Sequence, residues 1–299
     1  MNLPKHFVDT VNRIWGAQGT AWLKELPELI HFFSTKWHLN NITAFNNLTF
    51  NYVAQAHSNQ YNKPVVLKIG MPYPEFINEL KALTFYDGHG SVKLLAYDEQ
   101  KYGMLLAQIQ PGNTLKYFFP NQDEKAVEYT CQVMEKLHAH PIGNSTEFQT
   151  IDNKFLVFDS LKIPRRLQKQ VDIARNFVKE LSISAPKKYL LHGDLHHDNI
   201  LLDDQGNAVS IDPKGVIGEA AYEVGAFMCN PEALCEQYNI PTLLNRRLDQ
   251  FSQTLSIDRE RLTKACYARI ILSACWTVEA KGDWRDDAYF ADCIVQTKP

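Results

Sequence analysis

The stretch "LLHGDLHHDNILLDDQGNAVSIDPKG", Leu190 to Gly215, decides the fold class of this chain. Two β-type runs, "ILL" and "AVSI", are separated by the five residues "DDQGN", a composition typical of a hairpin connection. A hairpin here would bring Asn199, just before the first strand, close to Asp212, just after the second. Two side-chain oxygens would then face one point, as a hard cation such as Mg²⁺ requires. Asp194 lies five residues before Asn199, in a loop from which it could reach the same point as a general base.

Two other interpretations of this stretch were open. Asp and Asn commonly form turns before hairpins, and the Asp-Pro pair at Asp212 is an ordinary turn dipeptide. The spacing H-x-D-x-x-x-x-N, followed by a hairpin and a second aspartate, favours a functional site over a set of separate turns. A hydrolase metal cluster is the second alternative, but it would need further ligands on other strands, and the sequence offers no second such group. Its candidate ligands are His192, Asp194, His196, His197 and Asp198.

Composition excludes several classes of protein. The chain has 299 residues, of which 45% are hydrophobic and 22% charged, enough for two lobes with buried cores. A net charge of −3 gives no basic footprint for nucleic acid. The N-terminus lacks an apolar signal region, and no apolar run approaches the ~18 residues of a membrane span. We therefore expect a cytoplasmic protein without nucleic-acid or membrane partners.

The six cysteines are scattered without a C-x-x-C pair, which predicts reduced thiols and neither a disulfide framework nor a zinc knuckle. They are Cys131, Cys229, Cys235, Cys266, Cys275 and Cys293.

The hydrophobic period changes once along the chain. Residues 37–70 predict three strands, "PEFINELKALTFY" predicts a helix, and "VKLLAYD" and "YGMLLAQI" predict two more strands. The turn-forming "QPGN", Gln110 to Asn113, ends this part. Beyond it, helices are expected over 123–138 with Asn121 as the cap, and over 165–181, 219–229, 242–255, 258–281 and 284–295. The predicted domains are 1–109, including a helical extension 1–36, and 110–299.

A metal and a general base in one loop indicate phosphoryl transfer, which also requires a lysine for the phosphates and a glutamate to hold it. "VVLKIG" supplies Lys68, on a predicted strand. In the following helix Glu79 lies three residues after Phe76, on the side of the apolar stripe, so it would face inward toward Lys68. Glu75, one turn earlier, is a competing partner, and an exposed Glu79 at the edge of the stripe is the alternative.

Several motifs in order resemble the aminoglycoside phosphotransferases of the protein-kinase-like superfamily. They are "VVLKIG", "NELKALTFYDGHG", "PGNTL", "HGDLHHDN" and "IDPKG". The chain is similar above all to the branch of streptomycin 6-kinases and hydroxyurea-resistance kinases, from about Trp37 to Glu279. The resemblance implies an α+β, bilobal fold with a small five-stranded antiparallel sheet and one helix, followed by a larger, mainly helical lobe.

By this resemblance, Asp194 is the catalytic base, Asn199 and Asp212 bind Mg²⁺, and Lys68 binds the phosphates of ATP while paired with Glu79. The strand end "LLAQIQPG", which contains Gln108 and Ile109, corresponds to the hinge whose backbone holds the adenine. The chain departs from the family in two places. The loop "NITAFNNLTF" has no glycine, and Gln108 stands where a charged residue is usual, so the choice between ATP and GTP stays open.

The residues also suggest roles in positioning and acceptor binding. His192 is interpreted as a brace for the loop. A cationic, hydroxyl-rich acceptor needs acidic groups. The last third of the chain supplies Glu219, Glu223, Glu279, Asp283, Asp286 and Asp287, although each could be a solvated surface acid. Of these, Glu223, Glu279 and Asp283 are the expected acceptor-binding residues. Glu223 could instead brace its own helix, and Trp276 or Trp284 could stack on a guanidinium group of the acceptor.

We expect an ATP- and Mg²⁺-dependent O-phosphotransferase that acts on a hydroxyl of a small molecule, an aminoglycoside such as streptomycin or a related antibiotic. A metabolite kinase of choline, amino sugar or amino alcohol type is the alternative within the enzyme class. A catalytically silent nucleotide-binding module is the alternative outside it, and the intact set of Lys68, Asp194, Asn199 and Asp212 argues against that module.

Overall fold

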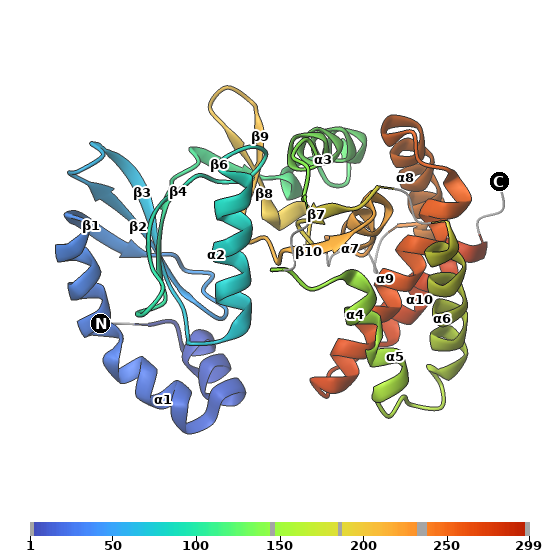
Figure 1. Ribbon diagram of the computed structural model, residues 1–299, viewed down its shortest axis with the longest axis horizontal. Coiled ribbons are helices and arrows are strands. Elements are labelled where there is room, and N and C mark those ends of the chain that lie inside the picture. Colours follow the sequence, from blue (N-terminus) through green and yellow to red (C-terminus); the bar gives the residue numbers. More distant parts are fainter. Residues whose placement is uncertain (1–2, 144–146, 185–186, 232–237, 297–299) are drawn as a thin grey trace. The chain divides into compact units, whose positions relative to one another are not determined.

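The chain folds into two compact units, Met1–Gln110 and Pro111–Pro299 (Figure 1). The computed structural model describes residues 3–143, 147–184, 187–231 and 238–296. The first unit carries an antiparallel sheet, and the second is mostly helical, which is the α+β, protein-kinase-like class predicted from the sequence.

The sheet of the first unit has five antiparallel strands in the order β1-β2-β3-β5-β4. Helix α2, Pro74–Tyr86, connects the third strand to the fourth. The predicted strands and helix are thus confirmed, with two shifts at their ends. The first strand begins after Trp37, because the Trp37 amide closes the preceding helix on the Phe33 carbonyl, and the last strand ends before Gln108. The strands are β1 (Leu39–Ala44), β2 (Tyr52–Ser58), β3 (Lys63–Ile69), β4 (Leu94–Asp98) and β5 (Gly103–Ala107).

Helix α1, Lys5–Lys36, precedes this sheet and has a break at Gly16. Its apolar residues recur on one face, as expected for an amphipathic helix that covers a sheet. The buried members of that face, Phe7, Trp22, Leu26 and Phe33, join one core cluster with the inward residues of β2 and β3.

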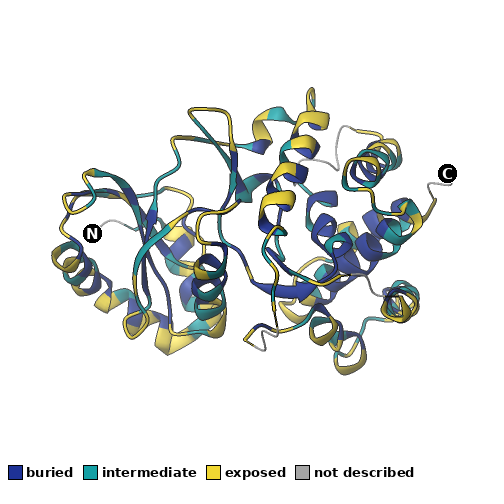
Figure 2. Cartoon of the chain, turned by 45° about the horizontal axis from the view of Figure 1, so that its top comes forward, coloured by how far each residue is buried: buried dark blue, intermediate teal, exposed yellow. Residues whose placement is uncertain are grey.

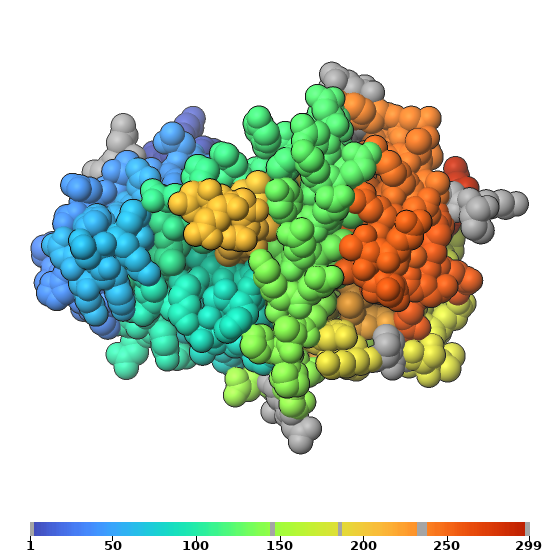
Figure 3. Space-filling model, turned by 90° about the horizontal axis from the view of Figure 1, so that it is seen from above, coloured from blue at the N-terminus to red at the C-terminus, as the bar shows by residue number. Residues whose placement is uncertain are grey.

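Helix α9, Arg259–Glu279, is the centre of the second unit. It contacts α6, α7, α8 and α10, so its middle part is buried on nearly all sides (Figure 2). Helix α3 lies against α8, as the green and orange surfaces of Figure 3 show. The other helices are α3 (Asp123–Leu137), α4 (Ile151–Phe155), α5 (Val157–Ser160), α6 (Gln168–Ile183), α7 (Gly225–Met228), α8 (Ile240–Leu255) and α10 (Arg285–Gln296), with 3-10 turns η1 (Leu115–Phe118), η2 (His197–Asn199) and η3 (Ala220–Val224).

Two small sheets lie among these helices. The predicted hairpin is confirmed, since β8, Ile200–Asp203, pairs with β9, Ala208–Ser210. Three short strands were not predicted. Strand β6, Pro111–Thr114, pairs with β8, and β10, Val216–Gly218, pairs with β7, Tyr189–Leu191. Pro111 is compatible with the edge position that β6 takes in its sheet.

The predicted cap of α3 was wrong. Gln122 precedes the helix without a side-chain cap, and Asn121 lies one residue further out. Asp123, the first helical residue, is turned inward to a buried arginine instead of serving the helix end.

Two expectations from composition concern the whole chain. Within the described ranges, no helix is long and apolar enough to cross a membrane. The predicted thiols are confirmed as free cysteines at Cys131, Cys229, Cys266, Cys275 and Cys293, whereas Cys235 lies outside the described residues.

Candidate active site

The first unit holds a buried ion pair. The Lys68 ammonium on β3 donates to Glu79 Oε1 on α2 at 2.6 Å, and both side chains are less than a tenth exposed. Glu75, the competing partner, is exposed. The predicted pairing is therefore confirmed, because the helical stripe that buries Phe76 carries Glu79 to the same side. The role of this pair in binding a nucleotide stays a prediction.

The stretches expected to contact the nucleotide in this unit have little regular structure. Gln108 and Ile109 follow β5 directly, are half-buried and belong to no strand; their contact with the adenine stays a prediction. The glycine-free connection between β1 and β2 runs from Phe45 to Asn51.

In the second unit, the loop between β7 and β8 carries Asp194. The shape of the loop depends on Gly193, which has a φ of +81°, a conformation that strains any residue with a side chain. If Gly193 carried a Cβ, this atom would lie 3.3 Å from the side chains of Lys214 and Val216. His192 is fully buried beside it. Its Nδ1 accepts from the Asp194 amide at 3.3 Å, and Nε2 lies 2.8 Å from the Ile211 carbonyl, which defines Nε2 as the protonated nitrogen. Burial lowers the pKa of His192, so it stays neutral and braces the loop, as predicted.

Glu223 holds the same loop from η3. Its Oε2 accepts from the His192 amide at 2.6 Å and its Oε1 accepts from the Gly193 amide at 2.8 Å. The side chain is fully buried. We therefore correct the expected role of Glu223 in binding the acceptor: both oxygens are occupied by backbone amides, and the residue fixes the loop that precedes Asp194.

Asn199 and Asp212 lie at the two ends of the hairpin, as predicted. The Ile211 amide donates to the Asn199 carbonyl at 2.9 Å, so the backbone of Asp212, the next residue, lies beside Asn199. The Asn199 Nδ2 donates to the Asp194 carbonyl at 2.9 Å, which leaves Oδ1 as the atom to offer a cation. Asp212 has φ +59°, a conformation that Asp tolerates better than most residues. An amide oxygen and a carboxylate fit the oxygen preference of Mg²⁺.

The alternative hydrolase cluster is not supported, because its members face different partners. His192 is bound to Ile211, His197 lies 3.7 Å from Asp123, and Asp198 pairs with Lys116 at 2.7 Å. Within the described part of the chain, no group of three or more His, Cys, Asp or Glu side chains could hold a metal ion.

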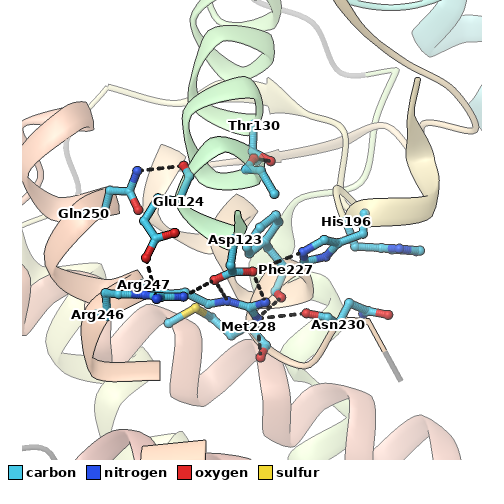
Figure 4. Close-up of polar contacts among 12 residues, drawn as sticks. Asp123, Glu124, Thr130, His196, Phe227, Met228, Asn230, Arg246, Arg247 and Gln250 are labelled. Carbon is cyan, nitrogen blue, oxygen red and sulfur yellow. Dashed lines mark hydrogen bonds and ion pairs between the residues drawn. The ribbon is translucent and has the colours of Figure 1, made fainter. Parts of the chain in front are cut away.

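A buried charge network around Asp123 lies at the C-terminal end of the loop between β7 and β8, next to His197 (Figure 4). Asp123 accepts from Arg247 Nη2 at 2.6 Å and Nε at 2.9 Å, and Arg247 also donates to the carbonyls of Phe227, Met228 and Asn230. Asp123 and Arg247 are both fully buried. Burial alone would raise the pKa of Asp123, but the polar contact with His197 at 3.7 Å, the hydrogen bonds from Arg247 and the guanidinium charge hold it well below its usual range. Burial lowers the pKa of His197 to about 4, so His197 is neutral at pH 7.

Sequence analysis missed Arg269, a buried arginine of α9. Its Nη2 donates to the Gly193 carbonyl at 3.0 Å and lies 4.0 Å from Asp194 Oδ1. The available signal was a single arginine inside the apolar run "ARIILSAC". Asp287 of α10 is a neighbouring acid: burial raises its pKa to about 6, and the charge of Arg269 opposes that rise.

The expected acceptor-binding residues differ in their surroundings. Glu279 is exposed at the end of α9. Asp283 is exposed too, but its carboxylate binds Arg285. The Arg269 guanidinium lies 4.8 Å from the centre of the Trp276 ring, while the tryptophan side chain is exposed, so stacking of Trp276 on a guanidinium group of the acceptor stays a prediction.

Comparisons with known proteins agree with this geometry. A family model described as aminoglycoside/hydroxyurea antibiotic resistance kinase matches residues 37–281. Streptomycin 6-kinase from Streptomyces glaucescens is 24% identical over 93% of this chain and 92% of its own. Hydroxyurea phosphotransferase from Kitasatospora aureofaciens is 24% identical over 93% of this chain and 81% of its own.

Solved structures share the fold. Choline kinase LicA from Streptococcus pneumoniae has a TM-score of 0.67 at 14% identity, over 91% of this chain and 99% of its own. The aminoglycoside phosphotransferase APH(4)-Ia, in a ternary complex with ADP and hygromycin B, has a TM-score of 0.65 at 13% identity, over 89% of this chain and 96% of its own.

Proposed function

We propose a specific reaction from the premise that this chain belongs to the aminoglycoside/hydroxyurea antibiotic resistance kinase family and is a small-molecule phosphotransferase. The reaction is transfer of the γ-phosphoryl group of ATP, with Mg²⁺, to a hydroxyl group of a cationic, hydroxyl-rich small molecule. An aminoglycoside of the streptomycin type is the proposed acceptor. Residues 1–109 would bind the nucleotide, and residues 110–299 would carry the catalytic groups and bind the acceptor.

One arrangement carries the proposal: Asp194 and Asn199 are tied together in one loop, and the hairpin returns the chain to Asp212 beside them. Phosphoryl transfer requires little covalent chemistry from the protein, so catalysis depends on positioning and on neutralising charge. Asn199 Oδ1 and the Asp212 carboxylate would hold Mg²⁺, which supplies positive charge to the phosphate oxygens when bound. Asp194 would orient the acceptor hydroxyl and accept its proton.

Residues of the first unit would bind the nucleotide. The Lys68 ammonium, held by Glu79, would bind the phosphates, and the backbone of Gln108 and Ile109 would bind the adenine. A lysine held by a buried carboxylate keeps its position without the ligand, so less side-chain freedom is lost on binding.

The acceptor class is supported by the family and by its named streptomycin kinases. Exposed carboxylates raise the local concentration of a cation. Glu279 is the stronger candidate for this role, since Arg285 already neutralises Asp283.

The two aspartates give the sharpest test, because they have different tasks. A ligand at about 100 times its Kd stabilises a protein by about 2.7 kcal/mol, which corresponds to a melting shift of roughly 5–11 °C for a domain of this size. Asp194→Asn should keep the shift induced by MgATP and lose nearly all transfer of radiolabelled phosphate to streptomycin. Asp212→Asn should lose both.

Asp204→Asn is the matched control, because Asp204 is an exposed residue in the turn of the same hairpin. It makes the same change of charge and should keep both the shift and the transfer. Near wild-type transfer by Asp194→Asn, or a full MgATP shift in Asp212→Asn, would refute the proposed roles. Streptomycin, hydroxyurea and an amino alcohol, tested in parallel as acceptors, would identify the acceptor class.

A further inference from the structure

The peptide groups of Gly193 are held from two sides by buried charged side chains. Glu223 Oε1 accepts from the Gly193 amide at 2.8 Å, and Arg269 Nη2 donates to the Gly193 carbonyl at 3.0 Å. Hydrogen bonds to charged groups are roughly twice as strong as neutral ones. These two contacts hold Gly193 in its left-handed conformation and so set the position of the backbone from which Asp194 begins.

Arg269 is itself built into the second unit. It is 6% exposed, and its guanidinium lies over the Trp276 ring at 4.8 Å from the ring centre. Gly225 makes room for its stem: a Cβ at Gly225 would lie 2.5 Å from both Cβ and Cγ of Arg269. Gly225, at the start of α7, and Trp276, about two turns further along α9, thus define where the guanidinium can lie.

We propose that Arg269 is a positioning residue for Asp194, which it controls through the Gly193 carbonyl and through its charge 4.0 Å from Asp194 Oδ1. The inference rests on the proposed role of Asp194 as general base. The guanidinium fixes the backbone before Asp194 and attracts Oδ1, so Oδ2, which lies 4.0 Å from His196 Nε2, would be the oxygen that meets the acceptor hydroxyl. Arginine suits this task better than lysine, because its planar fork donates to the carbonyl while its face stays on the indole.

Kinetic measurements separate positioning from binding. A displacement of about 1 Å in a reacting group costs on the order of 100-fold in rate. Arg269→Gln should therefore lower kcat about 100-fold and change the KM for streptomycin only a few-fold, because Arg269 acts on the base and not on substrate affinity. Arg269→Lys should recover part of kcat. Gly225→Ala should lower kcat while Arg269 is still present, because the added methyl group displaces its stem.

A spectroscopic measurement tests the same contact without activity. Labelling with carbonyl-¹³C glycine and ¹⁵N aspartate selects Gly-Asp peptide bonds, and the sequence contains two, Gly193–Asp194 and Gly282–Asp283. Arg269→Gln and Gly225→Ala should both shift the Gly193–Asp194 signal. The Gly282–Asp283 signal should stay in place and serves as the internal control.

The outcomes distinguish this inference from the proposed function. If Asp194→Asn is inactive and Arg269→Gln transfers at the wild-type rate, the role of Arg269 is refuted and the proposed function stands. If Asp194→Asn is active, the proposed function fails. An unchanged Gly193–Asp194 signal in both variants refutes the contact itself. Loss of melting temperature with full turnover per folded molecule would show that Arg269 only stabilises the fold, which also overturns the inference.

Discussion

Replacing Asp123 by asparagine should lower the free energy of unfolding by about 3–5 kcal/mol, the usual cost of breaking a buried ion pair from one side. Asp123 is fully buried and accepts two hydrogen bonds from Arg247. Asparagine would replace one acceptor by a donor and leave the Arg247 charge uncompensated. The three carbonyls that Arg247 keeps as partners favour the lower end of this range.

The measurement is urea unfolding at pH 7, supported by thermal melting. For a domain of 150–250 residues, 1 kcal/mol corresponds to about 2–4 °C, so the second unit should melt roughly 6–20 °C earlier. Glu124→Gln is the matched control, since this adjacent acid forms an exposed pair with Arg246, which also donates to Asp123 Oδ2 at 3.0 Å and would keep that contact; the change should cost less than about 1 kcal/mol.

A double variant completes the test. Asp123→Leu combined with Arg247→Met removes both charges and should recover much of the stability, because no charge then remains buried alone. Equal, small losses in Asp123→Asn and Glu124→Gln would refute the conclusion that the buried network stabilises this unit.

Three further predictions follow from the described contacts. Lys68→Met should raise the KM for ATP and lower kcat, whereas Lys63→Met on the same strand should leave both unchanged; equal effects in a steady-state assay would exclude Lys68 from the nucleotide site. Glu279→Gln should raise the acceptor KM at low salt more than Asp283→Asn does, since Asp283 is already paired with Arg285. Salt at about 0.5 M should reduce the difference, because it screens charges that are separated by more than a few ångströms. The folded-state pKa of Asp123 is depressed, so its contribution is present above its unfolded pKa near 4 and is lost as pH falls through the folded value. Urea unfolding between pH 6 and about 3 should therefore show a steeper loss of stability in the wild type than in Asp123→Asn; parallel curves would contradict the shift.

The sequence predicted most local elements, because their signals are local. The helix expected over 219–229 was wrong: this segment forms the 3-10 turn η3 followed by the four-residue helix α7. Alternation and turn residues located the hairpin that joins Asn199 to Asp212, and the stripe through Phe76 placed Glu79 on the side of Lys68. Both inferences depend only on residues within one or two elements.

The contacts that fix the loop could not be predicted, because their partners lie far apart in the sequence. Glu223 binds His192 across 31 residues, and Arg269 binds Gly193 across 76. Carboxylates and guanidinium groups occur mostly on surfaces, so a pattern alone assigns such residues to solvent or to a substrate. That is why Glu223 was expected in acceptor binding and Arg269 was not considered.

Helix α1 determines where the chain can be cut without exposing the core of the first unit. The family model begins at Trp37, one residue after α1 ends, yet Phe33 stacks on Trp37 with ring centres 4.6 Å apart. Phe7, Trp22 and Leu26 belong to the same core as the inward residues of the sheet. A fragment cut at the family boundary would leave the apolar side of this sheet in water, where it would promote aggregation. The segment matched by the family model is thus shorter than the segment that folds, and exchanges of this unit between relatives should carry α1 with its own sheet.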